Sequence, residues 1–160
     1  MNQRYLKDIS AINRAIDSFN SYLKPDFYIP TFDLNTAIEK TNIVKIIHGD
    51  WDGFPFPNNG TRGVYFVFGH EKTNMEKNGL YIGKASFRST TSGRLYARLH
   101  PHRTKEYFSM DGYNEEVYIL DYMASVNLDA IGFPFMASAL EEHLITSVKD
   151  TLNLLNGTGN

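Results

Sequence analysis

Two aromatic and β-branched segments that lie close together constrain the fold of this chain most. Residues 63–70 read GVYFVFGH, residues 79–86 read GLYIGKAS, and the stretch between them, EKTNMEKN, is polar. Aromatic and β-branched residues favour strands, and a polar connection of this kind joins two neighbouring strands. The sequence therefore predicts an antiparallel hairpin with a long tip.

Helical periodicity marks both ends of the chain. From 2 to 23, apolar residues recur every three or four positions, which predicts an amphipathic helix that ends at Lys24-Pro25. From 134 to 152, a second periodic stretch predicts another helix, and Pro134 suits its first turn. A single apolar stripe most often packs on a core, so these helices are expected to cover a sheet.

The remaining segments complete an α+β pattern. Residues 25–33 look extended, a short helix is expected from about Leu34 with Asp33 as its cap, and 49–60 is a turn-rich loop. Residues 92–102 predict a helix that ends at Pro101, and 115–124 a third strand. We expect one α+β domain, in which helices pack on a small three-stranded, mainly antiparallel sheet.

Composition narrows the class of protein. Of the 160 residues 42% are hydrophobic and 21% are charged, which is typical of a soluble globular domain. The chain has no cysteine, which excludes disulfides, Cys-based zinc sites and thiol catalysis. The N-terminus lacks an apolar signal core and no stretch is long and apolar enough to span a membrane, so we expect a cytoplasmic protein.

Positive charge is concentrated in one stretch, although the net charge is −2. Residues 84–105 contain no Asp or Glu. They carry Lys84, Arg88, Arg94, Arg98, His100, His102, Arg103 and Lys105. A guanidinium group is the natural partner of a phosphate, so this stretch suggests nucleic-acid binding, whereas a solvated basic face is the alternative. The two histidines lack a third ligand for a metal site.

Glu141 interrupts the apolar stripe of the last predicted helix. On a helical wheel it falls among Ala137, Leu140, Leu144, Ile145, Val148 and Leu152, whereas Glu142 falls at the polar edge. A carboxylate on a core-facing stripe is unfavourable unless it is paired or holds a metal. Three interpretations stay open: an ion pair with a buried arginine, a capping box with Ser138, or a metal site.

Tyr65 and Tyr81 lie on the two hairpin strands and can share one face of the sheet. A free tyrosine has a pKa of about 10, and a nearby cation such as Lys84 would favour the phenolate or polarise the hydroxyl. Gly83 beside Tyr81 would let a phosphate backbone come close. The alternative for each tyrosine is core packing with its hydroxyl hydrogen-bonded.

These positions follow one another in an order that resembles a known family. The chain has GVY at 63–65 and YIG at 81–83, followed by Arg98 with His102 four residues later, and then by Glu141 and Asn153. From about residue 60 to 160 this pattern resembles the GIY-YIG nucleases. The segments YIGKAS, RLHPH and LNLLNGTGN look most like those of the compact type II restriction endonucleases.

The resemblance implies a GIY-YIG-like fold and a catalytic centre with a divalent metal. It implies that Glu141 binds Mg²⁺ or Mn²⁺, with Glu142 as the rival ligand. It also implies that Tyr65, helped by Lys84, activates or positions the attacking water. Tyr81 then helps to orient the nucleophile and the phosphate.

Three further roles come from the same resemblance. His102 would act with Tyr81 in orienting the phosphate, Arg98 would neutralise charge on its non-bridging oxygens, and Asn153 would fix the local geometry. Contacts to nucleic acid are expected from Arg88, Arg94, His100, Arg103 and Lys105.

At the level of the whole protein, the resemblance implies a metal-dependent DNA endonuclease that cuts double-stranded DNA. A homodimeric type II restriction enzyme with a companion DNA methyltransferase is the leading expectation. In that scheme residues 1–60 form an N-terminal helical extension and loop, packed on a nuclease domain at 61–160. The alternatives are a repair, phage or mobile-element nuclease, and an inactive nucleic-acid-binding module.

Overall fold

The fold consists of α-helices packed on one antiparallel sheet, as the α+β pattern predicts. A computed structural model describes residues 3–34, 43–46, 55–99 and 116–156. The described α-helices are α1 (Leu6–Asn20), α2 (Thr91–Leu99) and α4 (Ala137–Val148). The strands are β1 (Ile43–Lys45), β2 (Gly63–Glu71), β3 (Asn78–Ala85) and β4 (Tyr118–Asn127).

The sheet has four strands in the order β1-β4-β2-β3, so the prediction of three strands was wrong. The strand that was missed is β1, which pairs antiparallel with β4 through Ile43, Val44 and Lys45. A short apolar run such as IVKII cannot be assigned to a strand or a helix by periodicity. Its strand conformation depends on pairing with β4, a contact that is distant in sequence.

The predicted hairpin is confirmed in its pairing and is shorter at its tip. β2 and β3 pair antiparallel from Gly63 opposite Ala85 to His70 opposite Asn78, and residues 72–77 connect them. The polar ends of EKTNMEKN therefore continue the strands. At the tip, the ammonium of Lys77 lies 2.5 Å from a carboxylate oxygen of Glu71.

Other predicted boundaries shift by a few residues. The first helix is preceded by a 3₁₀ turn at Gln3–Tyr5, the last by one at Pro134–Met136, and a third 3₁₀ turn occupies Pro25–Phe27. The third predicted strand begins and ends three residues later than expected. The short helix expected from Leu34, residues 49–54 of the expected loop, and the helix end at Pro101 lie outside the described residues. Residues 55–60 contain turns, as expected.

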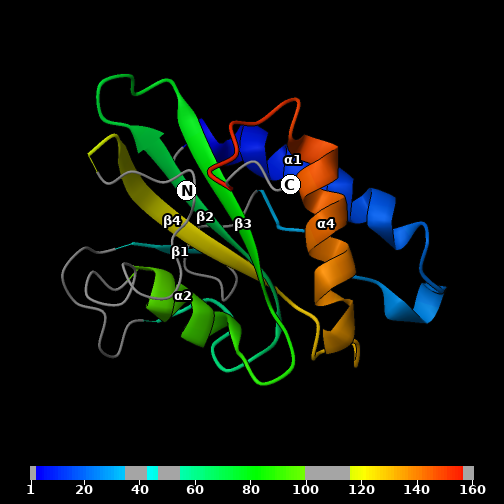
Figure 1. Cartoon of the computed structure of the whole chain (residues 1–160). Coiled ribbons are helices and arrows are strands. Elements are labelled where there is room, and N and C mark those ends of the chain that lie inside the picture. The colour runs from blue at the N-terminus through cyan, green and yellow to red at the C-terminus, as the bar shows by residue number, and fades with distance from the viewer. Residues whose placement is uncertain (1–2, 35–42, 47–54, 100–115, 157–160) are drawn as a thin grey trace.

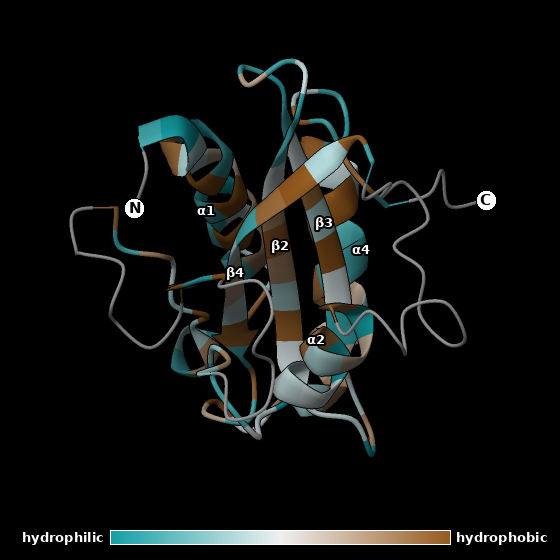
Figure 2. Cartoon of the chain, turned by 90° about the vertical axis from the view of Figure 1, so that its left-hand side faces the viewer, coloured by the Kyte–Doolittle hydropathy of each residue, from teal (hydrophilic) through white to brown (hydrophobic). Residues whose placement is uncertain are grey.

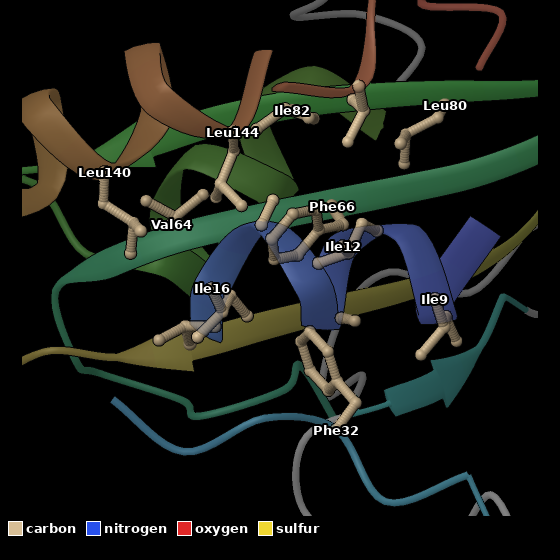
Figure 3. Packing of buried hydrophobic residues seen from close by; sticks show 14 of the residues in the cluster. Ile9, Ile12, Ile16, Phe32, Val64, Phe66, Leu80, Ile82, Leu140 and Leu144 are labelled. Atoms are coloured by element: carbon tan, nitrogen blue, oxygen red, sulfur yellow. The ribbon is translucent and has the colours of Figure 1, made fainter. Parts of the chain in front are cut away.

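One face of the sheet is covered by α1 and α4, as Figure 1 shows. Ile12 and Ile16 of α1 and Leu144 of α4 pack with Phe66 of the central strand β2 in the main hydrophobic core (Figure 3). The apolar side of α1 is turned toward the strands and its polar side outward (Figure 2). The periodicity of both helices therefore reflects burial against the sheet.

The opposite face of the sheet is covered by α2. Leu95 and Leu99 of this short helix are buried in a second cluster with Tyr65, Val67 and Tyr81. Alternate residues of β2 thus enter two different cores, because successive side chains of a strand point to opposite faces. This alternation explains why β2 is buried along almost its whole length.

The chain end pairs with β3, the last strand in the sheet order. The backbone N–H of Leu80 donates to the carbonyl of Asn153 at 2.9 Å, and that of Leu155 donates to the carbonyl of Leu80 at 2.7 Å. The side-chain amide of Asn156 accepts from the Ile82 N–H at 2.9 Å and donates to the Ile82 carbonyl at 2.7 Å. Asn156 therefore takes the place of a neighbouring strand beside β3.

The described part of 1–60 packs into the same body as the rest of the chain. α1 contributes to the main core, and β1 belongs to the sheet. No helix within the described ranges is long and apolar enough to cross a bilayer.

Replacing a core residue of α1 should therefore destabilise the whole domain. Ile12→Ala deletes a fully buried side chain and should lower the free energy of unfolding by about 2–5 kcal/mol. Lys7→Ala, at an exposed position of the same helix, is the control and should change it by less than about 0.5 kcal/mol. Urea unfolding measures both. Equal stability of the two variants would show that α1 is only an appendage.

Candidate active site

Tyr65 lies across Gly83 on the α2 face of the hairpin. The two residues are direct cross-strand partners in β2 and β3. A Cβ added to Gly83 would lie 2.5 Å from the Tyr65 hydroxyl oxygen, so only glycine leaves room for this ring. The space above Gly83, expected from the sequence to admit a phosphate backbone, is occupied on this face by a phenol.

Tyr81 completes a pair of phenols on the same face, as the strand periodicity predicts. Its ring and that of Tyr65 are stacked, with centroids 6.2 Å apart and an interplanar angle of 29°. Both belong to the cluster beneath α2, so the core-packing interpretation describes their rings correctly. Both side chains are buried, and the Tyr65 hydroxyl contacts a charged group of α2 that is described below.

Arg98 of α2 contacts both phenols. Its Nε donates a hydrogen bond of 2.6 Å to the Tyr65 hydroxyl, and its guanidinium carbon lies 4.5 Å from the centre of the Tyr81 ring. A cation over an aromatic face and a charge-assisted hydrogen bond are both favourable. Together they hold the guanidinium in one orientation beside the tyrosine pair.

A turn before β2 holds α2 in place, and sequence reasoning missed its role. Thr91, the first residue of α2, donates through its hydroxyl to the carbonyl of Asn58 at 3.1 Å, and its N–H donates to the carbonyl of Thr61 at 2.7 Å. The Asn58 side chain in turn donates to the buried Ser125 hydroxyl of β4 at 2.8 Å. The turn-forming segment PNNG was the available sequence signal, and the structure gives Asn58 a left-handed φ of 48° in this turn.

The environment of the two phenols keeps them protonated near neutral pH. Burial raises the pKa of Tyr65, and the positive charge and hydrogen bond of Arg98 offset only part of that effect. Burial also raises the pKa of Tyr81, and the neighbouring Tyr65 adds to the increase. A nearby cation does lower the pKa of Tyr65, as expected, but the cation is Arg98 and loss of solvent outweighs its effect. Of the two outcomes expected, a polarised hydroxyl therefore fits this environment and a phenolate does not.

Lys84 pairs with Glu141 rather than with Tyr65. It lies opposite Val64 in the hairpin, so its side chain is on the face that α4 covers. Its ammonium is 2.9 Å from Oε2 of Glu141. The ion-pair interpretation of Glu141 thus holds with a lysine in place of the expected arginine.

The position of Glu141 on α4 excludes the capping alternative. α4 begins at Ala137 with Met136 at the cap position, so Ser138 lies inside the first turn. The Glu141 side chain is 19% exposed between the buried Leu140 and Leu144, whereas Glu142 points to solvent. Among the two adjacent glutamates, the sequence correctly singled out the one that faces the sheet.

Glu141 also lies within electrostatic reach of the tyrosine pair. Its negative charge raises the pKa of both Tyr65 and Tyr81, in the direction opposite to the effect of Arg98. Two phenols and the Arg98 guanidinium on one face of the sheet, and the Lys84–Glu141 ion pair on the other, are therefore linked by charge across β3. This is the candidate active site.

One carboxylate of this site, that of Glu141, could hold a magnesium ion. The described residues contain no group of three or more His, Asp or Glu side chains that could enclose a metal. Mg²⁺ usually takes one or two carboxylates and leaves its other positions to water and to phosphate oxygens. Glu141, with Oε2 directed at Lys84, is the carboxylate of the cluster that could hold it.

Of the other residues predicted to contact nucleic acid or phosphate, only some lie in the described part of the chain. Arg94, one turn before Arg98, is close enough for its charge to lower the pKa of Tyr65. Arg88 is exposed in the turn after β3. His100, His102, Arg103 and Lys105 lie outside the described residues.

Asn153 is not brought to the tyrosine pair. Its side-chain amide donates to the Asn78 carbonyl at 2.9 Å and to the Tyr118 hydroxyl at 3.2 Å. Asn78 begins β3, whereas Gly83 and Lys84 lie near its other end. Asn156, three residues further along the chain, is the asparagine that supports the backbone of β3 next to Tyr81.

Comparisons with known proteins do not assign the chain to a family. Neither the protein-family models, nor the curated proteins, nor the solved structures contain a match to it. The resemblance to GIY-YIG nucleases therefore depends on the residues of the chain and on where the structure places them.

The close approach of Tyr65 to Gly83 makes a testable prediction about stability. Gly83→Ala should displace the Tyr65 ring and lower the free energy of unfolding by about 1–3 kcal/mol, with a change in the near-UV circular dichroism of tyrosine. Gly93→Ala is the control, because Gly93 is exposed in α2 and alanine favours helix. A Gly83→Ala protein as stable as wild type would contradict the packing described.

The raised pKa values of the two phenols predict how stability depends on alkaline pH. A group whose pKa is higher in the folded than in the unfolded state contributes stability that is complete below the unfolded value of about 10 and is lost as pH rises through the folded value. The free energy of unfolding should therefore fall above about pH 10. Tyr81→Phe should make this fall shallower, whereas Tyr22→Phe, at a position 77% exposed, should leave it unchanged. Urea unfolding across this pH range gives the slopes, and identical slopes for both variants would refute the assignment.

Proposed function

We propose that this protein is a metal-dependent endonuclease of the GIY-YIG type that hydrolyses phosphodiester bonds in double-stranded DNA. The observation that supports the proposal most is the hydrogen bond from Arg98 to Tyr65 beside Tyr81, with the carboxylate of Glu141 in electrostatic reach. These residues come from four separate elements, and the order of their motifs along the chain is the one that the resemblance requires.

Positive charge in the site suits a phosphodiester as substrate. The charges of Arg98 and Arg94 are close enough to lower the pKa of Tyr65. Lys84 lies on β3, three residues after Tyr81. A guanidinium whose orientation is fixed by Tyr65 and Tyr81 can stabilise charge on the non-bridging oxygens of a phosphate without reorganising. In this proposal Arg98 is the residue that contacts the scissile phosphate.

Tyr65 acts as a neutral phenol in the proposed mechanism. Its hydroxyl oxygen accepts a hydrogen bond from Arg98, and a phenol that accepts one hydrogen bond still has an O–H to donate. Because its pKa is raised, very little of Tyr65 is the phenolate that could accept a proton near neutral pH, so its role is to orient the attacking water and the phosphate. Of the two functions that the resemblance allows for Tyr65, positioning is therefore the one proposed.

Glu141 would hold the Mg²⁺ or Mn²⁺ ion through one carboxylate oxygen. When bound, the ion supplies a Lewis acid that stabilises negative charge on the phosphate and on the leaving oxygen. Lys84, which pairs with Glu141 in the structure, would then be available to contact the substrate phosphate.

The reaction consumes one water molecule per cut. The water oxygen forms a new bond to phosphorus, and the bond from phosphorus to one sugar oxygen breaks. One hydrogen of the water stays on the new phosphate monoester and ionises, and the other reaches the sugar oxygen as a proton through solvent. Tyr65, Tyr81 and Arg98 contribute by fixing the direction of attack and the phosphate charge.

For biological role, we propose site-specific restriction by a homodimer, on the strength of the resemblance to compact type II enzymes. A repair, phage or mobile-element nuclease would use the same chemistry. An inactive binding module would keep the cationic groups and would not cut.

Cleavage of plasmid DNA tests both the activity and the metal ligand. Glu141→Gln should lower the cleavage rate by at least about a hundredfold, because it removes the carboxylate that would hold the metal. Glu142→Gln is the matched control, since it makes the same change at the adjacent exposed position, and it should cut at close to the wild-type rate.

The products separate the alternatives. Discrete bands that appear with Mg²⁺ and are abolished by EDTA would support a restriction enzyme, and a smear or a preference for branched DNA would support the second biological role. Failure of wild-type protein to cut any DNA with Mg²⁺ or Mn²⁺ would overturn the nuclease proposal. Equal rates for Glu141→Gln and wild type would overturn the assignment of Glu141.

A further inference from the structure

The ion pair between Lys84 and Glu141 occupies the carboxylate that the proposed metal needs. The Lys84 ammonium lies 2.9 Å from Oε2 of Glu141, and a divalent cation at that oxygen would be repelled by the ammonium. The arrangement seen in the free protein therefore opposes metal binding at Glu141. An additional event has to remove Lys84 from this oxygen.

The charges around the site also oppose metal binding in the free protein. Arg98 and Arg94 influence Tyr65 with positive charge, Lys84 adds a third cation nearby, and Glu141 is the carboxylate whose charge reaches both phenols. Among the charges named here, all from described residues, a divalent cation entering this group meets more positive than negative charge. A phosphodiester reverses the balance, because it adds negative charge where the cations converge.

Lys84 is the partner that can move. Its side chain is 41% exposed, and its ammonium sits on a flexible four-carbon stem. Glu141 is 19% exposed and is held on α4 between Leu140 and Leu144, which are fully buried against the sheet. A change of partner thus requires only a new side-chain conformation of Lys84, with the helix and the strand left in place.

We propose that Lys84 and Glu141 form a latch that opens by exchange of partners when DNA and metal bind together. A substrate phosphate replaces Glu141 as the partner of Lys84, and the divalent ion replaces Lys84 as the partner of Glu141. This inference rests on the proposed nuclease function and adds an order to it: metal binds weakly to the free protein and more tightly in the presence of DNA. By reciprocity, metal increases the affinity for DNA by the same factor.

Metal binding without DNA tests the first half of the exchange. Lys84→Met removes the ammonium and should tighten the binding of Mn²⁺, followed by electron paramagnetic resonance of the free ion, by roughly tenfold. The gain should disappear in the double variant with Glu141→Gln. Lys77→Met is the matched control, because it breaks the Lys77–Glu71 pair at the hairpin tip, 2.5 Å long, and should leave Mn²⁺ affinity unchanged. Equal affinity of Lys84→Met and wild type would overturn the latch.

DNA binding without metal tests the second half. In EDTA nothing replaces Lys84 at Glu141, so Lys84 stays paired. Glu141→Gln frees it for one further phosphate contact, which should steepen the slope of log affinity against log salt by about 0.9 for a random-sequence duplex. Glu142→Gln removes the same charge and should leave the slope as in wild type. Adding Lys84→Met to Glu141→Gln should restore the wild-type slope. An unchanged slope in Glu141→Gln would contradict the exchange.

The latch and the nuclease proposal can be refuted independently. A wild-type protein that cuts plasmid DNA, together with unchanged Mn²⁺ affinity in Lys84→Met, would leave the nuclease and refute the latch. A wild-type protein that never cuts would refute the nuclease, even if the Mn²⁺ affinity and the salt slope respond as the latch predicts. Urea unfolding of each variant shows that a difference in binding does not arise from loss of the fold.

Discussion

The pairing of β2 with β3 in a single register is the constraint on which the site depends. It places Tyr65 opposite Gly83 and Lys84 opposite Val64, so that a phenol emerges on one face and an ammonium on the other. A shift of one residue would exchange the faces of every side chain. The register is fixed by two cores at once, since alternate residues of β2 are buried beneath α2 and beneath α1 with α4.

The same pairing determines which side chains of the hairpin the helices α2 and α4 contact. α2 packs on the face that carries Tyr65 and Tyr81, and this placement sets Arg98 over the Tyr81 ring and within hydrogen-bonding distance of the Tyr65 hydroxyl. α4 packs on the other face and sets Glu141 beside Lys84. Because β3 is the last strand in the sheet order, residues from both layers can meet around it. The site thus forms because a single layer of strands has α2 on one face and α4 on the other.

Much of this arrangement follows from local patterns in the sequence. The hairpin, the two amphipathic helices and the choice of Glu141 over Glu142 depend on periodicity, which reports which face is buried. β1 could not be assigned, because three residues carry no periodic signal and their partner strand lies far along the chain. Lys84 was assigned to Tyr65 although alternation along the strand places residue 84 on the face opposite Tyr81. Its pairing with Glu141 could not be predicted, because it depends on how α4 packs on that face.

Two further differences between the expected and the observed site come from burial and from distance, which a sequence motif does not describe. The phenolate expected at Tyr65 is disfavoured because its ring is enclosed beneath α2, where loss of solvent raises the pKa despite Arg98. Asn153 and Asn156 are only three residues apart, yet they pair with different parts of β3, and Asn156 is the one beside Tyr81. Neither effect can be calculated without the packed structure.

The central claim is that Arg98, the tyrosine pair and Glu141 act on one phosphate with one metal ion. A crystal structure with duplex DNA and Mn²⁺, whose position is fixed by anomalous scattering, tests it most directly. The account predicts a Mn²⁺ peak at a carboxylate oxygen of Glu141 and a DNA phosphate between that ion and the guanidinium of Arg98. Mn²⁺ at other acidic residues, or a phosphate backbone that passes away from Arg98 and Tyr65, would contradict it.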